Sequence, residues 1–138
     1  MVAPPQCPPG AAAMPTILVV EDDPMNRDML ARRLAWEGYQ IQTANNGRQA
    51  VEMASLEHPD LILMDVGIPL LNGWQATSQL KSRPDTSGIP IIILTAYALT
   101  EDRQKSISSG CDDYETKPIN FEHLLGKMRR CLDRTAVH

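Results

Sequence analysis

Aromatic residues and cysteines are scarce in this sequence. It contains two Trp, three Tyr and one Phe among 138 residues, so a hydrophobic core has to be built from Ile, Leu, Val, Met and Ala. The three cysteines, Cys7, Cys111 and Cys131, are odd in number and widely spaced, without a CxxC pair. We therefore expect a reduced, cytoplasmic protein in which Cys111 and Cys131 pack as small apolar groups.

The sequence also lacks a long apolar run and an excess of positive charge. No uninterrupted apolar run approaches the roughly 20 residues needed to cross a bilayer. The first charged residue is Glu21, so the N-terminus has no basic start of a signal peptide. Thirteen Lys and Arg against seventeen Asp and Glu give a net charge of −4. We therefore expect no association with a membrane. We also expect no direct contact with nucleic acid, because attraction to phosphates needs a basic surface.

Proline is concentrated at the N-terminus. Residues 1–15 hold five of the eleven prolines and no charge, a composition that cannot pack a core. We expect a Pro/Ala-rich disordered tail there, or a remnant of cloning. The remaining length fits one domain, residues 16–134, followed by a short C-terminal tail of residues 135–138.

From Thr16 onward, short apolar runs alternate five times with helical patterns. The expected strands are residues 16–20, 39–43, 60–65, 91–95 and 113–116. Asp23 can cap the first helix, whose apolar face we expect to run through Met25, Met29, Leu30 and Leu34. Continuous apolar strands alternating with helices indicate an α/β fold: a doubly wound, three-layer sandwich around a parallel sheet.

Polar residues stand where the predicted strands end. Glu21 and Asp22 follow the first strand and Asp65 ends the third. In such sheets ligands bind beyond the carboxyl ends of the strands. Three carboxylates in one crevice would repel one another unless a hard cation neutralised them, and oxygen ligands suit Mg²⁺. A carboxylate beside Mg²⁺ can attack phosphorus to give an acyl phosphate, whose oxygens Thr95 and Lys117 could bind.

Each of these residues also has a plainer explanation. The acidic run Glu21–Asp23 could simply cap a helix. Thr95 could be a β-branched residue that ends a strand, and Lys117 a solvated lysine before a turn. The inference therefore depends on the joint arrangement of two acidic strand ends, a hydroxyl and an ammonium at one edge of the sheet.

Five motifs, in order, resemble the receiver domain of two-component response regulators across about Thr16 to Arg134. They are ILVVEDD, LILMD, the loop with Pro69 and Asn72-Gly73, ILTA, and YETKP. The resemblance implies a CheY-like (βα)5 fold with five parallel strands in the order 2-1-3-4-5. Within this family, the sequence most resembles stand-alone DivK-type receivers or the receivers of hybrid kinases.

By this resemblance, Asp65 is the phospho-acceptor. Mg²⁺, with Mn²⁺ as an alternative, would be bound by Asp22, Asp65 and the backbone carbonyl of Gly67, and through a water by Glu21. The sequence departs from the family pattern at Ile68, where Met is usual, and at Gly67. Gly67 offers no side chain over the phosphoryl group, whereas Tyr97 could shield its other side.

The resemblance also assigns roles at the ends of the fourth and fifth strands. Thr95, Lys117 and the backbone of Ala96 would bind the phosphoryl oxygens. Tyr114 would be the switch aromatic that turns inward when Thr95 moves. The Lys117–Pro118 peptide bond would be cis.

The implied function is a signalling switch. It would take a phosphoryl group from a histidine kinase or a histidine phosphotransfer protein and present an altered surface to a protein effector, as a monomer or weak dimer. It would not be an enzyme beyond its own phosphotransfer and autodephosphorylation. The alternatives are a receiver fragment of a hybrid histidine kinase, a haloacid-dehalogenase-type phosphatase and a non-phosphorylated scaffold. The phosphatase needs a second Asp where Gly67 stands, and scaffolds typically lose part of the site.

Overall fold

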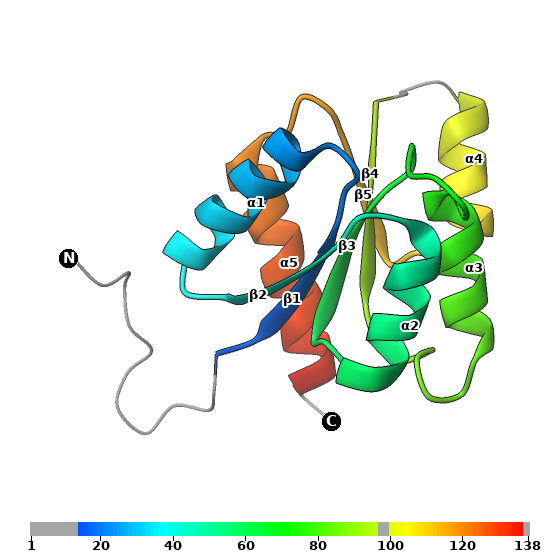
Figure 1. The fold of residues 1–138 in the computed structure, drawn as a ribbon, viewed down its shortest axis with the longest axis horizontal. Coiled ribbons are helices and arrows are strands. Elements are labelled where there is room, and N and C mark those ends of the chain that lie inside the picture. Colours follow the sequence, from blue (N-terminus) through cyan, green and yellow to red (C-terminus); the bar gives the residue numbers. More distant parts are fainter. Residues whose placement is uncertain (1–13, 97–99, 137–138) are drawn as a thin grey trace.

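The computed structural model describes residues 14–96 and 100–136, which form five strands and five helices in alternation (Figure 1). The strands are β1 (Thr16–Val20), β2 (Gln40–Ala44), β3 (Leu61–Asp65), β4 (Ile91–Thr95) and β5 (Asp113–Thr116). The helices are α1 (Pro24–Trp36), α2 (Gly47–Glu57), α3 (Gly73–Ser82), α4 (Thr100–Ser108) and α5 (Phe121–Ala136). Most of the expected N-terminal tail, with Cys7, and the expected shield Tyr97 lie outside the described residues.

The five strands form one parallel sheet in the order β2-β1-β3-β4-β5, which confirms the predicted fold. The strand register aligns the carboxyl ends of the strands at one edge. Asp65 lies opposite Leu94, and Thr95 lies opposite Thr116. The residues that end neighbouring strands are therefore brought together, as the sequence pattern predicts.

Helices cover both faces of the sheet, with α1 and α5 on one side and α2, α3 and α4 on the other (Figure 1). Because strand side chains alternate between faces, successive residues of each strand enter different cores. The core under α1 and α5 contains Ile17, Val19, Leu61, Leu63, Ile92, Leu94, Leu30, Leu34, Leu124 and Met128. The core under α2 and α3 contains Leu18, Val20, Ile62, Met64, Ile91, Ile93, Ala50, Ala54, Ala76 and Leu80. The two cysteines agree with the expectation: Cys131 is buried in the first core and Cys111 packs against the second.

Helix α1 begins as the sequence predicts, but its apolar face is narrower than expected. The Asp23 carboxylate accepts a hydrogen bond from the Asn26 N–H at 3.0 Å. Leu30 and Leu34 are buried, whereas Met25 is 80% and Met29 54% exposed. Met29 precedes Leu30 by one residue, which turns it about 100° around the helix axis and away from the sheet. The expectation that both methionines lie on the buried face was wrong.

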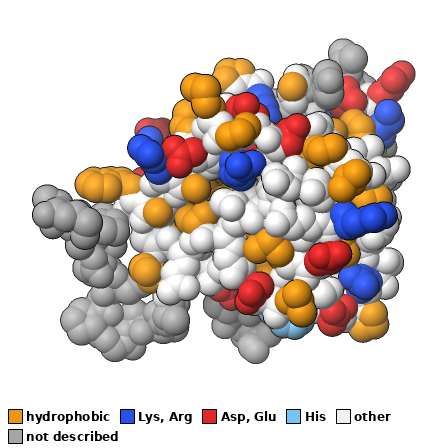
Figure 2. Space-filling view, viewed as in Figure 1, with side chains coloured by type: hydrophobic (Ala, Val, Ile, Leu, Met, Phe, Trp, Pro, Cys, Tyr) orange, Lys and Arg blue, Asp and Glu red, His pale blue; other side chains and the backbone are white. Residues whose placement is uncertain are grey.

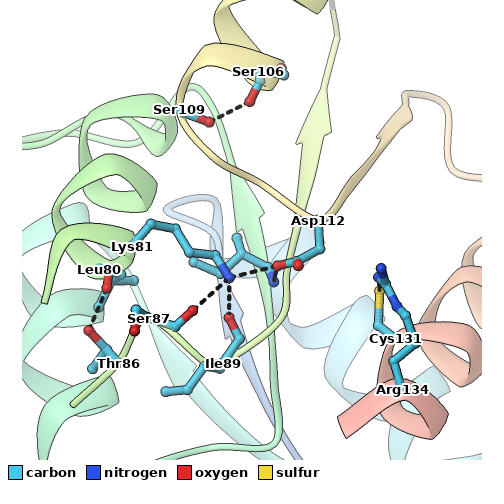
Figure 3. A network of polar contacts seen from close by, with 11 residues as sticks. Leu80, Lys81, Thr86, Ser87, Ile89, Ser106, Ser109, Asp112, Cys131 and Arg134 are labelled. Carbon is cyan, nitrogen blue, oxygen red and sulfur yellow. Dashed lines mark hydrogen bonds and ion pairs between the residues drawn. The ribbon is translucent and has the colours of Figure 1, made fainter. Parts of the chain in front are cut away.

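A polar network closes the opposite edge of the sheet, where β4 and β5 begin (Figure 3). Lys81 Nζ donates to the carbonyl oxygens of Ser87 at 3.2 Å and Ile89 at 2.8 Å, and it lies 2.8 Å from Asp112 Oδ2. The same Asp112 oxygen accepts the Ile91 N–H at 2.8 Å. The network joins the end of α3 to the start of β4 and to the segment that precedes β5.

Candidate functional site

The carboxyl ends of β1 and β3 bring three carboxylates together. Glu21 and Asp22 follow β1 directly, and Asp65 is the last residue of β3. One carboxylate oxygen from each residue lies within 4.8 Å of the others. Glu21 and Asp65 are buried, whereas Asp22 is exposed. The crevice therefore has a buried acidic floor and an acidic group at its open side.

Lys117 joins this cluster from the end of β5. Its Nζ lies 3.1 Å from Asp65 Oδ1 and 3.3 Å from Glu21 Oε1. Its backbone N–H donates to the Thr95 carbonyl at 2.8 Å, which continues the pairing of β4 with β5. The Lys117–Pro118 peptide bond is cis, in agreement with the resemblance. One ammonium thus contacts two of the three carboxylates.

Burial shapes the charge of the site. Glu21 is 2% exposed. Loss of solvation, with the hydrogen bond and charge of Asp65, raises its pKa from 4.5 to about 7. Burial also acts to lower the pKa of Lys117, but the hydrogen bond and charge of Asp65, together with Glu21, outweigh it, so the pKa of Lys117 is raised. The lysine stays charged, and it cannot balance three carboxylates alone.

The residues present fit a hard divalent cation. Three carboxylates within 4.8 Å supply the oxygen donors that Mg²⁺ prefers, and the exposed Asp22 leaves room for bound waters. Gly67 is exposed two residues beyond β3, and a Cβ added there would meet nothing within 4 Å. Its carbonyl as a metal ligand stays a prediction.

The remaining predicted residues lie at the same edge or just below it. Thr95, the last residue of β4, is 2% exposed, and Ala96 follows it on the surface. Tyr114 is half-buried in β5 and packs against the core under α2 and α3. Lys127 Nζ lies 5.7 Å from the centre of its ring. The phosphoryl-binding and switch roles of these residues stay predictions.

The sequence analysis missed a groove of about 380 Å³ beside the acidic cluster. Its lining residues come from α1, the β5–α5 connection, the start of α5 and the site itself: Glu21, Asn26, Met29, Leu30, Lys117, Pro118, Ile119 and Phe121. Hydrophobic side chains lie among charged ones over α1 and the upper edge of the molecule (Figure 2). The signal that could have indicated it was Met29, which we assigned to the core.

The fold and the acidic strand ends define a CheY-like α/β protein. A family model described as the response regulator receiver domain matches residues 17–129. The chain therefore belongs to the response regulator receiver domain family of two-component systems. It is a regulatory domain rather than a classical enzyme, and receiver domains bind Mg²⁺ at this acidic pocket.

Similar proteins include full-length regulators and isolated receivers. Response regulator MprA of Mycolicibacterium vanbaalenii is 40% identical over 119 residues, which are 86% of this chain and 51% of that protein. The probable transcriptional regulatory protein TcrX of Mycobacterium tuberculosis is 37% identical over 122 residues, 88% of this chain and 51% of that protein. The chain thus spans about half the length of these curated relatives.

One similar solved structure is described with a bound metal ion. The receiver domain of sensor histidine kinase PA1611 from Pseudomonas aeruginosa PAO1, described with a magnesium ion coordinated in the active site cleft, is 36% identical. Its TM-score is 0.82, with 88% of this chain and 99% of that chain covered. Chemotaxis protein CheY4 of Vibrio cholerae is 30% identical with a TM-score of 0.80, covering 86% and 99% of the two chains.

Within the described residues, no helix combines the length and the apolar character that a membrane crossing requires.

Proposed function

We propose that Asp65 accepts a phosphoryl group from a phosphohistidine and that the modification changes a protein-binding surface of this domain. One observation carries the proposal. Asp65 is the last residue of β3, the central strand of the sheet. Its carboxylate lies 3.1 Å from the ammonium of Lys117 and forms a cluster with the carboxylates of Glu21 and Asp22. A carboxylate nucleophile flanked by cation ligands and an ammonium is suited to phosphoryl transfer.

In this proposal, Asp22 and Asp65 bind Mg²⁺ directly, Gly67 contributes its carbonyl, and Glu21 acts through a water. When bound, the ion would neutralise the carboxylates and the charge of the phosphoryl oxygens. Mn²⁺ has a similar preference for oxygen ligands and would suit the same residues.

The residues of this chain then divide the transfer between them. An oxygen of Asp65 attacks phosphorus, the bond from phosphorus to the imidazole nitrogen of the donor breaks, and its electron pair remains on that nitrogen. Lys117, already in contact with Asp65, would pair with a phosphoryl oxygen. The Thr95 hydroxyl and the Ala96 N–H would donate to the other oxygens.

The response of the domain would pass from Thr95 to Tyr114. Thr95 lies opposite Thr116, and Tyr114 is two residues earlier in the same strand. Movement of Thr95 toward the phosphoryl group would make room for the Tyr114 ring to turn inward. The altered surface would serve a protein effector.

The proposed partners are a histidine kinase or a histidine phosphotransfer protein, and a downstream protein effector. The domain would act in the cytoplasm, as its cysteine usage suggests, as a monomer or weak dimer. One relative carries the name DNA-binding dual master transcriptional regulator RpaA, from Synechocystis. We assign no nucleic-acid contact to these 138 residues, whose net charge is −4.

A second candidate is a receiver that belongs to a hybrid histidine kinase. It is favoured by the likeness to PA1611 and by a receiver of a signal transduction histidine kinase from Syntrophus aciditrophicus, 39% identical with a TM-score of 0.81. In both candidates the same residue accepts the phosphoryl group. Transfer tests against separate kinases and phosphotransfer proteins would distinguish them.

The test of the proposal is phosphorylation of the purified chain. Wild type incubated with acetyl phosphate and Mg²⁺ should gain one phosphoryl group by mass spectrometry, and Asp65→Asn should gain none, because an amide cannot form an acyl phosphate. Asp85→Asn, an exposed aspartate in the loop before β4, is the matched control and should label like wild type. Equal labelling of Asp65→Asn would remove Asp65 from this role.

A further inference from the structure

Helix α4 gains little from apolar packing. Among its described side chains, residues 101–108, Ser106 is buried and the others are exposed or half-buried. Ile107, the one large apolar residue of the helix, is 58% exposed. Helix α5, in contrast, buries Leu124 and Met128 completely. Because burial of apolar side chains provides most of the packing energy of a helix, the position of α4 depends strongly on its polar contacts.

One such contact crosses from α3 to the buried serine of α4. The Trp74 indole N–H donates to Ser106 Oγ at 2.9 Å. The ammonium of Lys105 lies 5.0 Å from the centre of the Trp74 ring, within the range of a cation–π contact. Ser109 Oγ donates to the Ser106 carbonyl at 2.6 Å and so ties the end of the helix to the same residue (Figure 3). Ser106 is 0% exposed, so loss of Trp74 as a partner would leave a buried hydroxyl without its donor.

Trp74 is also close in structure to the phospho-acceptor proposed above. It follows Gly73, the first residue of α3, whose N–H donates to the Val66 carbonyl at 3.0 Å. A Cβ on Gly73 would lie 2.5 Å from the Asp65 carbonyl oxygen, so the backbone at the start of α3 packs directly against the end of β3. A displacement of Asp65 and Val66 would therefore be carried into the first turn of α3, and so to the indole.

The segment after α4 is anchored independently. Asp112 pairs with Lys81 near the end of α3 and accepts the Ile91 N–H, both at 2.8 Å (Figure 3). Gly110, with a φ of 91°, lies between this anchor and the helix, in a backbone region that favours glycine. The anchor is fixed to α3 and β4, so α4 can change direction about Gly110 once its own contact to α3 is released.

We propose that the Trp74–Ser106 hydrogen bond is a latch that holds α4 in the position seen here, and that phosphorylation of Asp65 opens it. The inference rests on the proposed phospho-acceptor role of Asp65. It adds a second route to α4, through the start of α3, beside the route from Thr95 to Tyr114. The latch differs from that route in using a neutral indole and a serine hydroxyl on two neighbouring helices.

The holding function of the latch is tested without phosphorylation. Ser106→Ala removes the acceptor with little change in volume, and amide hydrogen exchange in α4 should become about fivefold faster, the factor that corresponds to a hydrogen bond of about 1 kcal/mol. Ser108→Ala, an exposed serine of the same helix, is the control. Both variants gain the helix propensity of alanine, so exchange in Ser106→Ala that equals exchange in Ser108→Ala would overturn the latch.

The opening step is tested with Mg²⁺ and beryllofluoride as the phosphoryl mimic. In a Trp36→Phe background the Trp74 indole gives the one Trp N–H signal in an NMR spectrum, because the chain has two Trp. Binding of the mimic should move this signal toward its position in metal-free Ser106→Ala. An indole signal that stays in place while resonances around Asp65 shift would overturn the opening step. If no resonance around Asp65 responds, the proposed phospho-acceptor role fails and the opening step fails with it, whereas the exchange experiment still decides whether the latch holds α4.

Discussion

Glu21 provides a sharp test of the electrostatics of the acidic crevice. The residue is 2% exposed, and burial together with the neighbouring Asp65 raises its pKa from 4.5 to about 7. The folded protein therefore binds the Glu21 proton more tightly than the unfolded chain does. Between pH 4.5 and 7 the folded state holds more protons, so its free energy of unfolding must fall as the pH rises. The stabilisation by the proton is complete below pH 4.5 and is lost as the pH passes about 7.

The size of this effect follows from the shift. Each pKa unit corresponds to about 1.36 kcal/mol, so the metal-free protein should lose up to about 3 kcal/mol through this group between pH 5 and pH 8. Because Glu21 also interacts with the ammonium of Lys117, 3.3 Å away, and with the charge on Asp65, we expect the loss to be about 1–3 kcal/mol. Glu21→Gln keeps the shape of the side chain and removes the titration.

The assay is urea unfolding of wild type and Glu21→Gln in a metal chelator at pH 5 and pH 8. The variant should gain about 1–3 kcal/mol relative to wild type as the pH rises, since the groups outside this crevice contribute equally to both proteins. Glu52→Gln, an exposed glutamate of α2, should show no such gain. A stability difference between wild type and Glu21→Gln that does not change with pH would refute the reasoning.

Three further substitutions separate the roles within the site. Asp22→Ala should weaken Mg²⁺ binding, measured as the midpoint of a Trp fluorescence titration, while the fold survives or gains stability because one repelling carboxylate is gone; an unchanged midpoint would count against Asp22 as a ligand. Lys117→Ala should leave Mg²⁺ binding largely intact but should reduce or prevent labelling by acetyl phosphate. Labelling equal to that of wild type would contradict the role of Lys117. Thr95→Ala should still be phosphorylated but should lose the NMR shifts around Tyr114 that beryllofluoride produces in wild type. Equal shifts in both proteins would show that Thr95 does not couple the site to Tyr114.

The fold could be predicted because local and global signals agree along this chain. The strand Leu61–Asp65 is buried on both faces and is apolar up to its final Asp65, and a strand with two buried faces requires helices on both sides of a parallel sheet. The acidic cluster was predictable for the same reason. Glu21 directly follows β1 and Asp65 ends β3, its parallel neighbour, so the register of the two strands brings both residues to one edge.

Contacts between residues that are far apart in the sequence had no comparable pattern to indicate them. Trp74 and Ser106 are 32 residues apart and both have common alternative roles, a core aromatic and a helix serine. Lys81 and Asp112 are also far apart in the sequence, and the sequence analysis did not single them out, although they close the amino edge of the sheet. The prediction that Met29 lies on the buried face of α1 was wrong for a different reason. Met29 and Leu30 are adjacent in the helix, and their apolar character alone does not specify which of them faces the sheet.

The position of Asp65 in the sheet explains how one phosphoryl group could influence several surfaces. β3 lies in the middle of the sheet, with β1 on one side and β4 on the other, so a charge at its end adjoins the loops after all three strands. At the amino edge, Lys81 and Asp112 join α3, β4 and the segment before β5. We therefore expect added charge to act mainly on the loops and helix ends at the carboxyl edge. Among the helices there, α4 has the least buried apolar surface among its described side chains, so it is the element that the proposed modification moves most easily.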